Sequence, residues 1–327
     1  MPNEKLHLVN SCMSNISPDA KEFLDHCKYE KSLDHKSIKA YAIDLHQYHH
    51  FLNSSKCEQH IREIDKQWAR KYVHELFGKY EPRTAKRKIA TVKSFYSFLE
   101  YDDKILANPF RALRLRFNSP KSLPNVIPIR SIETLLVEMY RHRKRFRKTQ
   151  QASFAFFAAS RDLAIVELLF ATGIRVAELS HLKPVDLDLI KGSVYVHGKG
   201  NRDRKISLCQ PETIKLLKEY SQIRNRFYGD CPYFFTNRLG ERYSEQSIRF
   251  MISKHAQLAG LSSRIMPHMF RHTLATLLLE NGVDTRVIQT ILGHSSILTT
   301  QIYTSVAATH QRQVLSKKHP RLKLRVG

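Results

Sequence analysis

Apolar residues recur at helical spacing through the first hundred positions of the chain. Over 83–101 they fall at Ala85, Ile89, Val92, Phe95, Tyr96 and Leu99. The stretch 34–53 has the same period, which is typical of amphipathic helices, and 65–78 can supply another helix. We therefore expect a loose polar lead over 1–15 and an all-helical domain over 16–117.

Prolines interrupt the pattern after this domain. Pro109 follows the last helix, and Pro120, Pro124 and Pro128 come within a few residues of one another. A proline biases the residue before it toward extended backbone, so this density opposes regular structure. We place a linker at 118–128.

Helical periodicity returns after the linker. Ser131 is expected to cap a helix, and a strongly apolar helix is expected over 160–170, ended at Gly173 by a left-handed cap. The next helix is expected to begin at once, at Ile174. Arg175 then lies at a helix start, where backbone N–H groups also point outward toward anions.

Short alternating segments at 194–196 and 205–208 flank a glycine-containing turn at 198–201. This arrangement predicts a β-hairpin with Lys199 near its tip.

Further helices are expected from Pro211 and over 244–259, 267–280 and 284–292. Gly282 and Gly293 are placed to end the last two. The predicted fold class is mainly α with a small β-sheet. An all-helical N-terminal domain precedes a mixed α+β domain over 129–309, and a basic tail follows over 310–327.

Charge indicates the kind of partner. Lys and Arg number 54 against 30 Asp and Glu, a net charge of +24, which predicts a polyanion such as DNA. No continuous apolar span or lipidation signal is present, and the first residues do not resemble a signal peptide. We expect a cytoplasmic protein without membrane contact. The five cysteines are scattered, with no pair at metal-ligand spacing, and are expected to be reduced.

Basic residues gather on one side of the predicted 83–101 helix. Arg83, Lys86, Arg87 and Lys93 lie opposite its apolar positions. We favour contact between this face and DNA phosphates. The alternative is a solvated face, which most such charge runs are.

Residues suited to phosphate chemistry occur around 267–280. His268 and Arg271 are three apart, so a helix places them on one face, close enough to hold one anion. A tyrosine hydroxyl brought to the same place would be a nucleophile toward phosphorus. A His-x-x-Arg pair occurs by chance in many helices, and a lone tyrosine more often belongs to a core. The argument therefore depends on several motifs occurring together.

Four motifs do occur in order, and together they resemble those of the tyrosine recombinase (phage integrase) family. They are ATGIRVAEL at 171–179, HGKGNR at 197–202, PHMFRHTLAT at 267–276, and LGHSS followed by TTQIY over 292–303. The likeness extends from about 130 to 305, and the helical region before it looks like the family's core-binding (SAM-like) domain.

The resemblance implies six catalytic residues. Tyr303 would attack the scissile phosphate, forming a 3′-phosphotyrosyl bond and freeing a 5′-hydroxyl. Arg175 and Arg271 would clamp the non-bridging oxygens, and Lys199 would protonate the leaving oxygen. The remaining two are His268, as proton acceptor or phosphate donor, and His294, as a weaker phosphate donor.

Neighbouring residues have supporting roles in this interpretation. Glu178, three after Arg175, would pair with that arginine or another nearby group and hold it in position. His272 is expected to make a structural hydrogen bond, and Arg202 to contact DNA. No metal and no other cofactor is expected, since arginine and lysine supply the positive charge and the covalent bond conserves the phosphodiester energy.

The resemblance also implies the assembly: four protomers on double-stranded DNA whose sites carry inverted repeats, with the 310–327 tail docking on a neighbouring protomer. A non-cleaving DNA-binding regulator of the same fold and a type IB topoisomerase acting alone are the alternatives. Resolution of dimers and integration of a mobile element both stay open.

Overall fold

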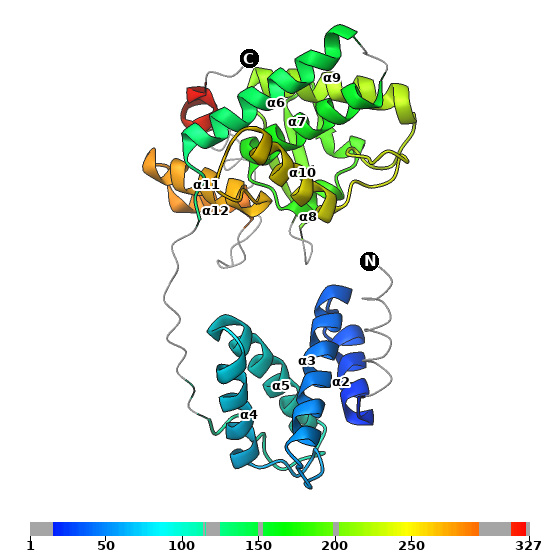
Figure 1. The fold of residues 1–327 in the computed structure, drawn as a ribbon, viewed down its shortest axis with the longest axis vertical. Helices are drawn as coiled ribbons and strands as arrows, with labels where there is room; N and C mark the ends of the chain where they lie inside the picture. The colour runs from blue at the N-terminus through cyan, green and yellow to red at the C-terminus, as the bar shows by residue number, and fades with distance from the viewer. Residues whose placement is uncertain are drawn as a thin grey trace. The chain divides into compact units, whose positions relative to one another are not determined.

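The computed structural model of the chain describes residues 16–113, 115, 125–149, 153–198, 203–293 and 315–324. The chain divides into two compact units, Met1–Ser122 and Leu123–Gly327 (Figure 1). Within the described ranges, no helix has both the length and the apolar character needed to cross a membrane.

The described part of the first unit is a bundle of helices. These are α2 (Pro18–Tyr29), α3 (His35–Ser54), α4 (Lys66–Lys79) and α5 (Pro82–Tyr101). The three predicted helices are confirmed to within one residue at each end. Helix α2 was not predicted, although Pro18 occupies its first turn and the Ser17 hydroxyl accepts a hydrogen bond from the Ala20 N–H at 3.3 Å.

Aromatic side chains fill the core of this unit. The hydroxyls of Tyr48 and Tyr96 are 2.9 Å apart, and the Tyr96 hydroxyl also donates to the Ile61 carbonyl at 3.0 Å. Phe110, beyond the end of α5, is buried against both tyrosine rings. The chain that follows the last helix is therefore part of the same core.

The second unit is larger and mixed. Its elements in chain order are α6 (Ile129–Thr149), α7 (Phe154–Thr172), α8 (Val176–Ser180), η1 (Pro184–Asp186), β1 (Leu187–Asp188), β2 (Ser193–Val196), β3 (Arg204–Ser207), α9 (Pro211–Tyr228), α10 (Glu245–Leu258), α11 (Pro267–Glu280), α12 (Thr285–Leu292) and η2 (Pro320–Lys323). Helix α7 is buried almost all round and packs against α6, α9 and α11. It is the centre of the core, as expected of a helix that is apolar on every side.

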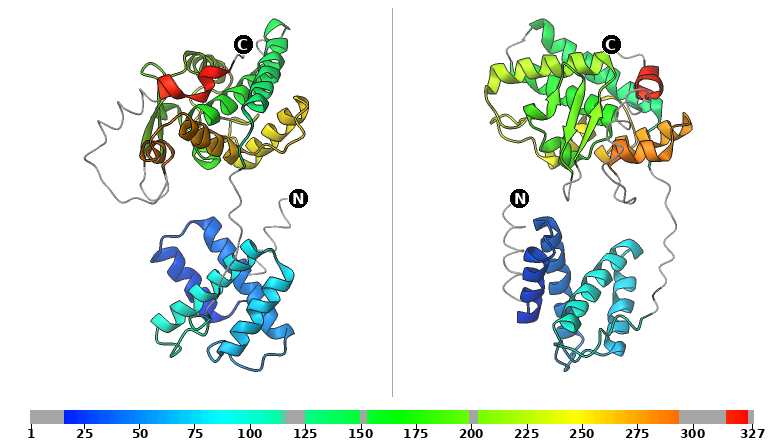
Figure 2. Two further views of the ribbon diagram at one scale, coloured as in Figure 1. Left: turned by 90° about the vertical axis from the view of Figure 1, so that its left-hand side faces the viewer. Right: turned by 180° about the vertical axis from the view of Figure 1, so that it is seen from behind.

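The three short strands form one antiparallel sheet in the order β1-β2-β3 (Figure 2). In the β2–β3 pair, Val194 lies opposite Ile206 and Val196 opposite Arg204. Both strands of the predicted hairpin are therefore confirmed, and its turn residues 199–202 lie outside the described ranges. Strand β3 also contacts α12, so the sheet is joined to the last helices of the unit.

Several helix ends differ from the prediction. Helix α6 begins at Ile129, and Ser131 lies inside its first turn, because the Pro128 carbonyl already accepts the Ser131 N–H at 2.9 Å. Helix α7 starts at Phe154, well before the predicted residue 160. The Ser153 hydroxyl caps this start by accepting a hydrogen bond from the Phe156 N–H. Helix α8 begins at Val176, not Ile174, because Arg175 keeps extended backbone angles as its N-terminal cap.

The described part of the basic tail, 315–324, packs on its own chain. Leu315 is fully buried, His319 lies 3.0 Å from the Ala171 carbonyl, and the Arg321 guanidinium pairs with Glu167 of α7 at 2.9 Å. These residues complete the core of the second unit, and docking of the tail on a neighbouring protomer stays a prediction.

Candidate active site

A glycine turn at the end of α7 leads into the site. Gly173 has a φ of 62°, which a glycine adopts without strain, and a Cβ there would lie 2.7 Å from a methyl of Leu292. The predicted cap at Gly173 is thus confirmed. The absence of a side chain lets the turn after α7 approach the end of α12.

Arg175 is the first charged group after this turn. Its backbone N–H and its Nη1 each donate to the Glu178 carboxylate at 2.8 Å, and its Nη2 donates to the Gly293 carbonyl at 3.2 Å. The side chain is nevertheless 45% exposed. The guanidinium is therefore held in place on one side and open to solvent on the other.

Glu178 connects Arg175 to a second arginine. The Glu178 side chain is only 7% exposed, and its two carboxylate oxygens accept from Nη1 and Nη2 of Arg204 at 3.1 and 2.8 Å. Burial alone would raise the pKa of the Glu178 carboxyl, but hydrogen bonds and charge from Arg204 and Arg175 outweigh it and hold the pKa below its usual value. The carboxylate stays ionised and fixes both guanidinium groups.

Sequence reasoning missed Arg204. A signal was present, because side chains alternate along a strand and Arg204 shares the face of Ile206, which is fully buried. A charged residue on a buried strand face needs a partner of opposite charge. Glu178 is that partner.

Arg271 of α11 is the buried member of the same arginine cluster. It is 7% exposed, and its Nη1 and Nη2 donate to the carbonyls of Gly173 and Leu292 at 2.9 and 2.6 Å. Burial, together with the charges of Arg175 and Arg204, lowers the pKa of Arg271 to about 10. The group remains protonated at neutral pH, so three arginines outnumber the single carboxylate and the cluster attracts anions.

His268 and His272 lie on the exposed side of α11. Their ring centroids are 6.1 Å apart, nearly edge to face. Desolvation lowers the pKa of His272, and electrostatic repulsion from His268 and Arg271 lowers it further. The structural hydrogen bond expected of His272 is not found among the described residues. His268 is one helical turn from Arg271, on the exposed surface next to the arginine cluster.

Four predicted site residues lie outside the described ranges. These are Lys199, Arg202, His294 and Tyr303. The chain on either side of the hairpin turn is ordered by Asp203, which accepts from the Gly198 N–H and the His197 ring, both at 3.1 Å. His294 and Tyr303 come after the end of α12 in the sequence. The predicted cap of this helix at Gly293 is confirmed by a φ of 67°.

The basic face predicted for α5 is exposed, but one of its four residues is also engaged by a carboxylate of another helix. Arg83, Lys86, Arg87 and Lys93 all lie on the outside of the helix. The Arg87 guanidinium is engaged by both oxygens of Asp44, a fully buried residue of α3. Arg87 therefore joins α5 to α3 while half of its side chain stays exposed, and its contact with DNA stays a prediction.

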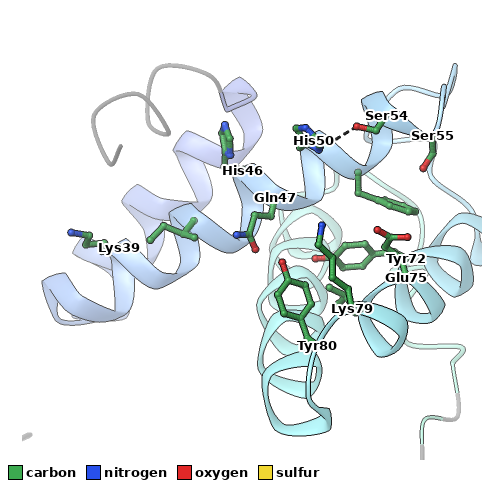
Figure 3. Close-up of a pocket in the computed structure, with 13 residues that line it drawn as sticks. Lys39, His46, Gln47, His50, Ser54, Ser55, Tyr72, Glu75, Lys79 and Tyr80 are labelled. Carbon is green, nitrogen blue, oxygen red and sulfur yellow. Dashed lines mark hydrogen bonds between the residues drawn. The ribbon is translucent and has the colours of Figure 1, made fainter. Parts of the chain in front are cut away.

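A pocket of about 730 Å³ lies between α3 and α4 in the first unit (Figure 3). Its walls include the apolar side chains of Ile43, Phe51 and Leu76, and Tyr72, whose buried hydroxyl has no hydrogen-bond partner among the described residues. The pocket shares no residue with the arginine cluster. Within the described part of the chain, no group of three or more His, Cys, Asp or Glu residues is arranged to hold a metal ion.

Comparison with known proteins covers both units. Residues 144–310 match the model described as the Phage integrase family, and residues 20–102 match the Phage integrase, N-terminal SAM-like domain. A tyrosine recombinase of Agathobacter rectalis is 42% identical over 94% of this chain and 98% of that protein. Tyrosine recombinase XerC of Thermodesulfovibrio yellowstonii is 34% identical over 94% of this chain and 98% of its own length.

The fold has solved counterparts as well. The XerH site-specific recombinase bound to a palindromic difH substrate, in a post-cleavage complex, superposes with a TM-score of 0.67. The two sequences are 20% identical, and the match covers 93% of this chain and 83% of the other. At this level of identity the likeness concerns the arrangement of the elements.

Proposed function

Since the chain belongs to the phage integrase family, whose similar members are tyrosine recombinases, we propose that it cleaves and rejoins DNA at specific sites through Tyr303. The observation that carries the assignment of residues is the meeting of Arg175 and Arg271 beside the end of α12. The chain runs from this end directly into the segment with His294 and Tyr303.

The cluster suits a transition state on phosphorus. In cleavage, the Tyr303 oxygen forms a bond to the phosphorus while the bond from phosphorus to the 5′-oxygen breaks. Negative charge grows on the non-bridging oxygens, where preorganised guanidinium groups stabilise it without reorganising. Arg175 presents its solvent-facing side to this position, and Arg271 is fixed by two backbone carbonyls.

Two proton transfers accompany this exchange of bonds. A free tyrosine has a pKa near 10, so the hydroxyl of Tyr303 needs an acceptor, for which we propose His268. Lys199, near the tip of the hairpin, would give its proton to the departing 5′-oxygen, and His294 would donate a hydrogen bond to the phosphate. Reversal of these steps with a new 5′-hydroxyl rejoins the strand.

The partner is double-stranded DNA, which the net charge of +24 favours. We propose recombination sites with inverted repeats, bound by four protomers, and phosphate contacts from Arg83, Lys86, Arg87, Lys93 and Arg202. The similar relatives come from bacteria, so we propose the cytoplasm as the compartment. Excision or integration of a mobile element and resolution of DNA dimers would both use this reaction.

A nicked suicide substrate tests the proposal. The purified protein should accumulate a covalent DNA adduct in EDTA without nucleotide, whereas Tyr303→Phe should bind the same DNA and form none. Binding without adduct under any condition would leave a non-cleaving regulator. Adduct with relaxation of supercoiled DNA that needs no particular site would indicate a topoisomerase.

A further inference from the structure

The last two carbonyls of α12 and the carbonyl of its cap, Gly293, are each bound by a different guanidinium group. Arg204 donates through Nε to Ile291 at 3.0 Å, Arg271 to Leu292 at 2.6 Å and Arg175 to Gly293 at 3.2 Å. The carbonyl end of a helix carries partial negative charge, which these cations offset. Three separate segments thereby fix the point from which the chain leaves toward Tyr303.

Arg204 differs from the other two arginines. Its side chain is 9% exposed, and each of its three nitrogens has a partner within the protein, Nε on Ile291 and both terminal nitrogens on Glu178. A planar fork closed on a carboxylate fixes both orientation and distance. Among the described residues, all three nitrogens of Arg204 are thus engaged by groups of the protein itself, and these contacts act on the position of other residues.

The backbone at Gly293 is shaped around Arg204. A Cβ at this position would lie 3.1 Å from both Cδ and Nη1 of Arg204, closer than such contacts normally come. The glycine thus lets the end of α12 rest directly against the guanidinium. A side chain at Gly293 would push the guanidinium of Arg204 away from the end of α12.

We propose that Arg204 is a positioning residue for strand cleavage, an inference that rests on the function proposed above. It ties β3, at the base of the hairpin that carries Lys199, to Glu178 and to the end of α12. Through Glu178 it orients Arg175, and through Ile291 it sets the start of the Tyr303 segment. A misplacement of about 1 Å in such a centre costs on the order of 100-fold in rate.

The test uses the full-length protein on a nicked suicide substrate at saturating DNA, in single turnover. The variants are Arg204→Ala and Arg204→Lys, compared with Arg141→Ala as a matched control. Arg141 also pairs with a glutamate, Glu138 at 2.8 Å, but on the surface of α6, with its side chain 61% exposed. The measurements are the rate constant of adduct formation, the fraction of enzyme that reacts, and the Kd for DNA.

Arg204→Ala should lower the rate constant about 100-fold while the reacting fraction and the Kd stay within about threefold of wild type. Arg204→Lys should still lose at least about tenfold, because an ammonium keeps the charge but cannot form the fork. Arg141→Ala should react like wild type.

Two results would overturn the positioning role. The first is a reduced reacting fraction with an unchanged rate constant, which means that Arg204 only helps the protein fold. The second is a wild-type rate constant in Arg204→Lys, which also decides the matter if the alanine variant does not fold. A wild-type protein that forms no adduct refutes the proposed function itself, and the two failures are therefore distinguishable.

Discussion

Replacing Arg321 by alanine should destabilise the second unit strongly. Glu167 is fully buried in α7, and its carboxylate accepts from the Arg321 guanidinium, from the Tyr140 hydroxyl at 2.8 Å and from the Thr213 hydroxyl at 3.1 Å. The substitution removes the only positive group among these three donors. Breaking a buried ion pair from one side typically costs about 3–5 kcal/mol, because the remaining charge is left in a medium that solvates it poorly.

The chain contains its own reference for this measurement. Its single tryptophan is Trp68, in α4 of the first unit, so tryptophan fluorescence reports that unit alone. Far-UV circular dichroism during heating follows both units. With about 2–4 °C per kcal/mol for a domain of this size, the second unit of Arg321→Ala should melt roughly 6–20 °C lower. The Trp68 transition should not move.

A double substitution separates charge from packing. Glu167→Gln combined with Arg321→Ala removes the uncompensated charge and should regain most of the lost stability, while Glu167→Gln alone should also destabilise. If Arg321→Ala melted within about 2 °C of wild type, or if the glutamine restored nothing, the carboxylate would not be the origin of the effect and the reasoning would be wrong.

Two further outcomes follow from the same structure. Burial lowers the pKa of His319 to about 4 from an ordinary 6.5. Above pH 6.5 the imidazole is therefore neutral in both the folded and the unfolded chain, and the free energy of unfolding is not reduced by its protonation. As pH falls from 6.5 toward 4 the unfolded chain takes up the proton first, which should cost up to about 3 kcal/mol in denaturant unfolding and should be absent in His319→Gln. In adduct formation, Arg175→Ala and Arg271→Ala should each lose far more rate than His294→Ala, and equal losses would show that the weak member is misassigned.

Much of the fold could be predicted because local signals agreed with the tertiary structure. Helix α11 was predicted with its observed bounds, since Pro267 fits the first turn and Gly282 follows the end. Gly173 and Gly293 were predicted as caps because only the left-handed conformation ends those helices compactly. These features depend on a few neighbouring residues, which a sequence displays directly.

The site was only partly predictable for the opposite reason. Arg175 and Glu178 are three residues apart, and their contact is the local one between the N-terminal cap of a helix and its third residue. The pairing of Glu178 with Arg204 depends on how β3 lies against α8, which no local pattern records. The same limit explains Arg87, whose exposure was predicted correctly while its partner Asp44 on another helix was not.

The arginine cluster joins parts of the chain that are far apart along it. The contacts of Arg175 with Gly293, of Arg271 with Gly173 and of Arg204 with Ile291 span 118, 98 and 87 positions. A polypeptide still emerging from the ribosome therefore lacks the carbonyls of Ile291 and Gly293, which hold Arg204 and Arg175, until α12 and its cap have been synthesised. We expect that incomplete chains and fragments ending before α12 can attach to a chromosome by charge alone but cannot break it.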